Sequence, residues 1–251
     1  MRTAALCCLI ALVACTFALY DGLSGADLRA AIKKDYYRHT SLGYDKARQD
    51  MYGYIDNVDG YVTGIYTDLQ LEYEYGSRDT SQNPDLNCEH IVPQSFFDKK
   101  DPMVSDLHHM RPSYSQANSA RNHYPFEVIP DDEVTQWYSQ DMISTLQPDE
   151  SDIDQWSRFR KDGSANSAWE PLPENRGTVA RAVLYFYTMY DQFIDEIDKI
   201  GDINMFLQWN ADHPPSDWDG IRNSNAEYMQ GNRNPYVDYP DMCDRAFEDL
   251  I

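Results

Sequence analysis

The segment 87–92 constrains the fold of this chain more than any other stretch. It places a carboxylate, Glu89, beside an imidazole, His90, in a short apolar run that Pro93 closes. The two β-branched residues before the proline favour pleated, half-buried positions, so the run predicts a β-strand that the proline terminates. A strand that begins here carries two groups capable of acid–base and metal chemistry.

A second short strand is expected at residues 106–112, again stopped by a proline, Pro112. Residues 113–122 follow directly, and a proline at or near the first position predicts that they form a helix. The first strand carries the carboxylate and the imidazole, and the helix carries Asn118. Strand, strand and helix together indicate a compact site for a metal ion and a base.

Four sequence blocks follow one another in this region: C-E-H-x-V-P-Q-S-F-F from Cys88, S-D-L-H-H-x-R-P from Ser105, A-N-S-x-R from Ala117 and Y-P-F from Tyr124. Together they resemble the endonuclease I family, secreted or periplasmic nucleases of the ββα-metal (His-Me finger) superfamily. Residues 176–182 and 231–237 also resemble the family, so the likeness covers residues 30–240.

The chain is expected to have an α+β fold, a helix-rich single domain around a ββα-metal core with a small antiparallel sheet. Residues 60–66 alternate enough to be a strand. The segment 130–174 is polar and acidic, and it reads as a long surface excursion. Apolar residues recur at helical spacing in five segments, 25–38, 44–55, 178–193, 203–209 and 216–229.

Residues 1–18 are interpreted as a signal peptide, and residues 19–251 as the nuclease domain. One basic residue, Arg2, precedes an apolar run that is too short to span a bilayer. A competing interpretation makes Cys15 the lipidated residue of a bacterial lipoprotein box. Either interpretation predicts an exported protein that is secreted or periplasmic, and no transmembrane segment is expected.

Export changes what the cysteines imply. Three of the five cysteines lie in the leader, so Cys88 and Cys243 remain for the folded domain. Two cysteines in an oxidising compartment most simply form one disulfide, so we expect a Cys88–Cys243 bridge. The alternative is two unpaired thiols.

The net charge counts against a nuclease. The sequence has 42 acidic and 21 basic residues and a formal net charge of −21, whereas nucleic-acid binders usually carry a basic footprint. The charge is uneven, however, because residues 88–126 hold as many lysines and arginines as aspartates and glutamates. The expected site is therefore locally neutral inside an acidic protein.

Phosphodiester hydrolysis needs a base for the attacking water and a positive charge beside the phosphate. A neutral imidazole suits the first task, so His90 is the expected general base. The family resemblance assigns Glu89 and Asn118 to the metal, and their oxygens suit Mg²⁺, with Mn²⁺ or Ca²⁺ as substitutes. The products would carry 5′-phosphates.

Several further residues are candidates for the substrate phosphate. Arg121 and Asn122 lie three and four residues after Asn118, hence on the same helical face. Arg121 is expected to contact the phosphate, or alternatively to pair with an acidic neighbour. Arg111 is another candidate. Some family members have a phosphate-binding arginine between the two strands, where this chain has only Lys99-Lys100.

The other histidines leave several interpretations open. His109 lies in the second predicted strand, next to the strand that bears His90, and we expect it to orient His90 by a hydrogen bond; the alternative is a buried histidine whose bonds are satisfied elsewhere. Another alternative is a zinc site built from His90, His108, His109 and His123, although the tight ligand spacing of such sites is missing.

The sequence thus predicts a secreted, Mg²⁺-dependent, monomeric endonuclease acting on DNA and RNA. Contacts to backbone phosphates carry no direct sequence information, so little sequence specificity is expected. A catalytically silent, metal-stabilised binding module and a zinc-dependent hydrolase of another substrate stay open as alternatives.

Overall fold

The computed structural model describes residues 20–163 and 165–251. The expected signal peptide, residues 1–18, and the lipoprotein-box Cys15 lie outside these ranges. No helix within the ranges has the length and apolar character that a membrane crossing requires.

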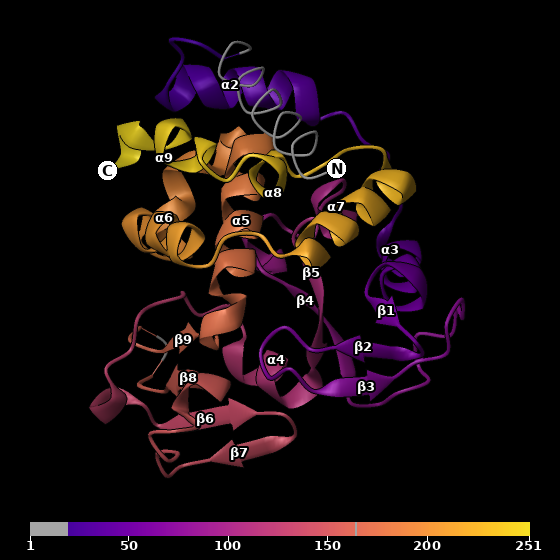
Figure 1. Ribbon diagram of the computed structural model, residues 1–251, viewed down its shortest axis with the longest axis vertical. Coiled ribbons are helices and arrows are strands. Elements are labelled where there is room, and N and C mark those ends of the chain that lie inside the picture. The colour runs from indigo at the N-terminus through magenta and orange to yellow at the C-terminus, as the bar shows by residue number, and fades with distance from the viewer. Residues whose placement is uncertain (1–19, 164) are drawn as a thin grey trace, which may run out of the picture.

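The described residues form an α+β fold in which most helices lie in the upper half of Figure 1 and small antiparallel sheets lie mainly in the lower half. The α-helices are α2 (Gly25–Tyr36), α3 (Tyr44–Asp50), α4 (Ser115–Arg121), α5 (Pro173–Met189), α6 (Ile203–Asp212), α7 (Asp217–Gln230), α8 (Pro235–Asp238) and α9 (Met242–Ala246). The first sheet consists of β1 (Asn57–Val58), β2 (Tyr61–Thr63) and β3 (Gln70–Glu72), and the second of β4 (Leu86–His90) and β5 (Met110–Tyr114). The last has the order β7 (Met142–Ser144), β6 (Gln136–Ser139), β8 (Ser157–Arg160) and β9 (Ala168–Glu170).

Helix α5 runs through the middle of the molecule, with α2 on one side and the β6–β9 sheet at the other end (Figure 1). Its residues from Val179 to Met189 are all buried, and all of them except Arg181 and Thr188 belong to the larger apolar cluster. Gly177 is required near its start, because a Cβ atom there would lie 2.0 Å from the carbonyl oxygen of His213. A helix apolar all round is one that the rest of the domain covers.

The five predicted helices are confirmed, with shifts at their ends. Helix α7 shows the local cause of one boundary: Ser216 caps it, and Asp219 completes a capping box with the Ser216 backbone. Gly231 ends the helix with φ of 99°, a left-handed conformation that glycine adopts without a Cβ penalty. The predicted helix 44–55 is α3 followed by a π-helical turn, Met51–Ile55.

The second predicted strand is displaced along the chain. Residues 106–109 form a turn, because the Asp106 carboxylate accepts the His108 backbone N–H at 3.0 Å. Strand β5 therefore begins at Met110, and Pro112 lies inside it rather than ending it. Pro112 is tolerated because β5 pairs only with β4, while its carbonyl accepts the Ile65 N–H. The helix consequently begins at Ser115.

The prediction of a surface excursion at residues 130–174 is wrong. This segment forms the four-stranded β6–β9 sheet, and its aromatic residues other than the half-buried Trp156 are buried. Trp169 of β9 packs against Tyr66 with ring centroids 5.1 Å apart, and Phe159 lies 5.8 Å away. The many acidic and serine residues of this segment made it polar on average, although a few large aromatic side chains are enough to pack it against the rest of the protein.

The predicted Cys88–Cys243 disulfide is absent, and the alternative of two unpaired thiols is correct for the described residues. Cys88 on β4 belongs to the smaller apolar cluster, between α3 and the β4–β5 pair. Cys243 on α9 belongs to the larger cluster around α5. Figure 1 shows β4 and α9 well apart, so a disulfide between the two cysteines would require a rearrangement of the backbone.

Candidate active site

Glu89 is the fourth residue of β4, and two buried neighbours hold its carboxylate. Its Oε1 atom accepts a hydrogen bond from the Tyr66 hydroxyl at 2.6 Å and pairs with Nη1 of Arg121 at 3.2 Å. Arg121 is the last residue of α4 and is fully buried. The carboxylate is thus fixed between β4 and α4.

Burial is the largest influence on the pKa of the Glu89 carboxyl. It raises the pKa of Glu89 to about 7, and the charge on Arg121 and the hydrogen bond from Tyr66 oppose the rise only in part. A divalent cation beside the carboxylate would favour its charged form. The group is therefore one whose ionisation and metal binding would be coupled.

Asn118 lies on α4 next to the backbone of β4. Its amide nitrogen donates to the carbonyl oxygen of Cys88, the residue before Glu89, at 3.4 Å. Its amide oxygen accepts no hydrogen bond from the residues that the structure describes, and the side chain is half-buried. Helix α4 therefore brings an oxygen donor beside the strand that carries Glu89.

His90, the last residue of β4, is held as a neutral imidazole. Its Nε2 lies 3.0 Å from the Val104 carbonyl oxygen, which only accepts, so Nε2 carries the proton. Nδ1 is then the acceptor, and the Gln94 side-chain amide donates to it at 3.0 Å. Burial lowers the pKa of His90 to about 3, with a further contribution from His109.

The surroundings of His90 are mainly aromatic. The ring centroids of Tyr44 and Phe97 lie 5.6 Å and 6.3 Å from that of His90, and the ring of His109 meets it edge-on at 5.3 Å. Adjacent residues of a strand point to opposite faces. His90 nevertheless lies at the end of β4, where the chain leaves the sheet toward the turn that begins at Pro93.

The structure places Arg121 differently from the expected phosphate contact. Besides the ion pair with Glu89, its guanidinium donates to the carbonyl oxygens of His90 at 3.4 Å and Ile91 at 2.8 Å. Its carbon Cζ lies 4.5 Å from the ring centroid of Phe126. The alternative of a salt bridge to an acidic neighbour is correct, and the geometry makes Arg121 a positioning residue.

His109 supports His90 by packing rather than by a hydrogen bond. Its Nε2 bonds to the Met103 carbonyl oxygen at 2.7 Å, and its ring also contacts Phe186 of α5 edge-on at 5.0 Å. No hydrogen bond joins His109 to His90 in the described part of the chain. The orienting bond comes from Val104 instead.

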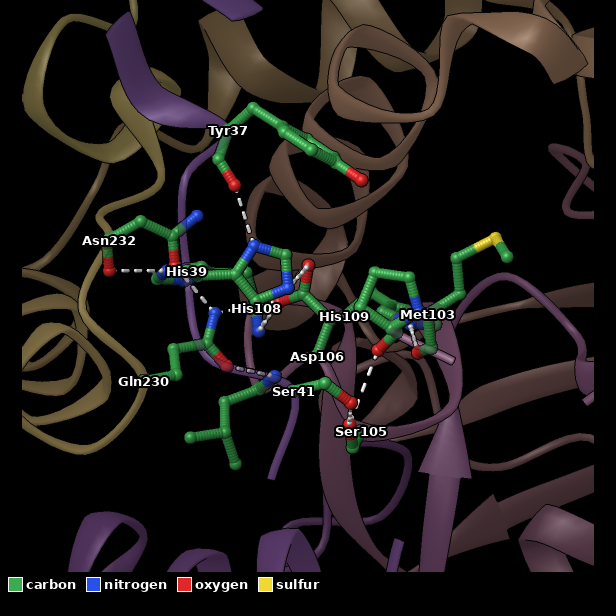
Figure 2. Close-up of polar contacts among 12 residues, drawn as sticks. Tyr37, His39, Ser41, Met103, Ser105, Asp106, His108, His109, Gln230 and Asn232 are labelled. Atoms are coloured by element: carbon green, nitrogen blue, oxygen red, sulfur yellow. Dashed lines mark hydrogen bonds and ion pairs between the residues drawn. The ribbon is translucent and has the colours of Figure 1, made fainter. Parts of the chain in front are cut away.

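The turn that carries His108 and His109 is organised by Asp106, a buried carboxylate in the cluster of polar side chains of Figure 2. Asp106 accepts hydrogen bonds from Tyr190, Tyr185 and Gln230 at 2.7 to 2.9 Å. Burial raises its pKa, but the surrounding histidines and Gln230 hold it below the usual range by a larger effect. Asp106 therefore remains a carboxylate that ties the turn to α5 and α7.

The histidines do not form the alternative zinc site. His108 bonds through Nε2 to the Asn232 carbonyl oxygen at 2.9 Å, and His123 through Nδ1 to Asn122 at 2.9 Å. Within residues 20–163 and 165–251, no group of three or more His, Cys, Asp or Glu side chains is arranged to hold a metal. Each ring is committed to a different partner.

The remaining phosphate candidates occupy two different settings. Lys99, Lys100 and Asn122 are exposed, and Lys100 pairs with Asp98 at 3.0 Å. Arg111 is buried on β5, in register with Glu89 on β4. The lysines and Asn122 are accessible to a large substrate, whereas the buried Arg111 lines a cavity.

Sequence reasoning missed several residues that position the site. Gln94 lies inside the block that begins at Cys88, so its short spacing from His90 along the chain could have suggested the contact. Tyr66 lies 23 positions before Glu89, outside every block, and nothing in the sequence connects them. Val104 acts through its backbone carbonyl, which the side-chain identity does not reveal.

The matches to known proteins agree with one another in pointing to nucleases. The sequence model of the endonuclease I family matches residues 24–241. The extracellular ribonuclease of Bacillus amyloliquefaciens is 25% identical over 247 residues, which covers 90% of this chain and 76% of that protein. The extracellular ribonuclease of Bacillus subtilis (strain 168) is 24% identical over 248 residues, with the same coverage. Endonuclease-1 of Buchnera aphidicola subsp. Baizongia pistaciae (strain Bp) is 25% identical over 133 residues, covering 53% of this chain and 46% of that protein.

Proposed function

This chain belongs to the endonuclease I family, and we propose that it is a secreted, metal-dependent endonuclease that cleaves DNA and RNA with little sequence specificity. Its family and its nuclease relatives support a nuclease, a hydrolase of nucleic acid. The observation that carries the mechanism is the hydrogen bond from His90 Nε2 to Val104, since it leaves Nδ1 as the basic nitrogen of the residue that follows Glu89 in the chain.

His90 acts as the general base. Its pKa is lowered by burial, so the ring is unprotonated at neutral pH and accepts a proton without first losing one. In the resting structure the Gln94 amide occupies Nδ1. Gln94 is half-buried, and we propose that it yields this position to the attacking water when substrate binds.

Glu89 and Asn118 fit a hard divalent cation such as Mg²⁺, for which Mn²⁺ or Ca²⁺ would substitute. Carboxylate and amide oxygens are ligands of this ion, which needs only one or two from the protein. The unpartnered Asn118 oxygen and the coupled ionisation of Glu89 agree with such a role. When bound, the cation would supply positive charge for the phosphate and the leaving oxygen.

Residues of this chain carry out the proton transfer from water and hold the metal ligand in place. His90 removes a proton from water, whose oxygen attacks phosphorus, and the 3′ oxygen leaves and is protonated by solvent. The products carry 5′-phosphates. Arg121 and Tyr66 hold the Glu89 carboxylate in place throughout, since both are buried and neither reaches the substrate.

Low sequence specificity follows from where the chain offers contacts. The exposed Lys99, Lys100 and Asn122 are suited to phosphates of the backbone, which carry no direct sequence information. The relatives named extracellular ribonuclease support a secreted setting and action on RNA, and DNA is proposed as a further substrate. We expect the protein to act as a monomer.

The test uses the purified chain from Leu19 onward with supercoiled plasmid and with single-stranded RNA. Cleavage is compared in Mg²⁺, Mn²⁺, Ca²⁺, Zn²⁺ and EDTA, and the ends are tested for a 5′-phosphate by enzymatic ligation. Nicking followed by linearisation in Mg²⁺, abolished by EDTA, is expected. Failure of folded protein to cleave in any divalent metal would leave a silent binding module, and activity restored by Zn²⁺ alone would favour a zinc hydrolase.

A further inference from the structure

A cavity of about 670 Å³ opens between β2, β5, α5 and α7, the elements at the centre and right of Figure 1. Its lining includes Arg111 and Pro112 of β5 but not Glu89, His90 or Asn118. The volume is in the range of ordinary small-molecule sites. Because Arg111 pairs in register with Glu89, the cavity lies one strand away from the candidate active site.

Three arginines line this cavity, and two of them are neutralised. Arg222 forms a bidentate ion pair with Asp56 at 2.7 and 3.0 Å. Arg181 pairs with Asp219 at 3.4 Å. The remaining arginine, Arg111, has no such carboxylate.

Arg111 is only 7% exposed. Its Nη1 donates to the carbonyl oxygens of Leu107, His108 and Met110, and its buried Nε has no acceptor. No carboxylate in the described residues lies within ion-pair distance of it. Burial lowers the pKa of Arg111 to about 9, with Arg222 contributing in the same direction, while the more distant Asp56 and Asp219 oppose this in part. A buried cation without an ion-paired carboxylate is costly, so an anion reaching it would be stabilised.

The mouth of the cavity has a different character. Trp218 of α7 lines it and is 40% exposed, so part of its indole is accessible to a ligand. The exposed carboxylates Glu174 and Asp212 also line it. Aromatic rings stack on nucleobases whatever their sequence, and carboxylates accept hydrogen bonds from base amino groups. The acidic mouth disfavours a bare anion.

We propose that this cavity is a subsite for one nucleoside phosphate, with the phosphate on Arg111 and the base on Trp218. The occupant would be the nucleotide next to the cut, or the 5′-phosphorylated product that it becomes. In this respect the inference rests on the proposed nuclease function and names a binding subsite for it. The subsite would explain how an acidic chain holds a polyanion, since one buried cation engages one phosphate.

Binding to the intact chain in EDTA tests the subsite without any cleavage. Adenosine 5′-monophosphate, adenosine and inorganic phosphate are titrated by calorimetry and by tryptophan fluorescence. We expect the nucleotide to bind most tightly, with inorganic phosphate competing and adenosine alone weaker by about tenfold or more, since charge-assisted hydrogen bonds to the phosphate are lost.

The matched variants are Trp218→Ala and Tyr228→Ala, both on α7. Tyr228 is 87% exposed and does not line the cavity. Trp218→Ala is expected to weaken nucleotide binding about tenfold, the lower part of the range for base–aromatic stacking, and Tyr228→Ala to leave it unchanged. Arg111→Met should abolish the competition by phosphate, with folding checked by circular dichroism. If this variant does not fold, the Trp218 pair and the phosphate competition decide.

The outcomes separate the two proposals. Absence of saturable nucleotide binding, or equal binding by the two α7 variants, overturns the subsite. If plasmid is still cleaved in that case, the nuclease function stands without it. Binding that depends on Trp218 in a protein that never cleaves would support the subsite and sink the nuclease mechanism instead.

Discussion

The Nε2 proton of His90 is donated to the backbone carbonyl oxygen of Val104, 3.0 Å away. This bond decides which nitrogen of the ring is basic, and a backbone acceptor cannot be removed by changing the Val104 side chain. The carbonyl belongs to a 3-10 turn, Met103–Ser105, that leads directly into the turn held by Asp106. The tautomer of the proposed base therefore depends on a backbone segment that the rest of the fold secures.

The buried ion pair between Arg121 and Glu89 should be strongly coupled. Arg121→Met removes the buried charge that opposes the rise of the Glu89 pKa, so at about pH 9 the carboxyl must either stay charged without a partner or take up a proton against the solution pH, and we expect a loss of about 3–5 kcal/mol in the free energy of unfolding at that pH. Adding Glu89→Gln should restore much of this loss, because the uncompensated charge is then gone. Urea unfolding without metal measures both. A single variant as stable as the parent protein would contradict the positioning role of Arg121.

The Tyr66 hydroxyl should affect metal dependence more than folding. Tyr66→Phe removes the 2.6 Å bond to Glu89, so the carboxyl is protonated more readily and competes less well for a cation. We expect the Mg²⁺ concentration for half-maximal cleavage to rise about tenfold, a loss of about 1.4 kcal/mol. The rate should recover at high Mg²⁺. Tyr73→Phe, another buried tyrosine, is the control, and an equal shift in both variants would show that Tyr66 has no special role.

Asp106 gives the fold a defined response to acid. Its pKa is depressed in the folded protein, so its stabilisation is complete above the ordinary aspartate pKa of about 4 and is lost as pH falls further. Asp106→Asn should cost about 2–3 kcal/mol at neutral pH, because several donors lose a charged acceptor. The difference in unfolding free energy between the two proteins should shrink below about pH 4. A difference independent of pH would mean that the carboxylate charge is not what matters.

The two thiols of the folded domain should be unreactive in the native protein. Burial raises the pKa of both Cys88 and Cys243, so neither is a thiolate at neutral pH. Alkylation without reductant is expected to add nothing to the folded chain from Leu19 onward and two groups after denaturation, as read by intact mass. A denatured chain that takes up no label until it is reduced would reinstate the disulfide.

Local patterns predicted the elements of the site but not their contacts. The strand with Glu89 and His90 and the helix with Asn118 followed from periodicity and proline positions, because these act over a few residues. The strand boundary predicted from Pro112 was wrong. A proline can lie inside a strand that pairs on one side only, and β5 pairs only with β4. That is a property of the sheet, which no local pattern reports.

The contacts that the sequence did not show are long-range or involve the backbone. Tyr66 reaches Glu89 because β2 and β5 come together where the Ile65 N–H bonds to the Pro112 carbonyl. The role of Arg121 is decided by burial: an arginine on the face of a short helix is exposed or buried according to what packs over it. Here Phe126 covers it, and the ion pair replaces the expected phosphate contact.

We propose that His90 is the base of a metal-dependent nuclease centre. This role is tested by the single-turnover cleavage rate of a 5′-labelled oligonucleotide in saturating Mg²⁺, compared between His90→Ala and His123→Ala. His123 is exposed and bonds only to its neighbour Asn122 among the described residues, so it is the matched control. General base catalysis contributes about 10²–10⁴-fold, and we expect a loss of that size for His90→Ala and almost none for His123→Ala. Equal rates for the two variants, both shown to be folded, would contradict the role of His90 as the general base.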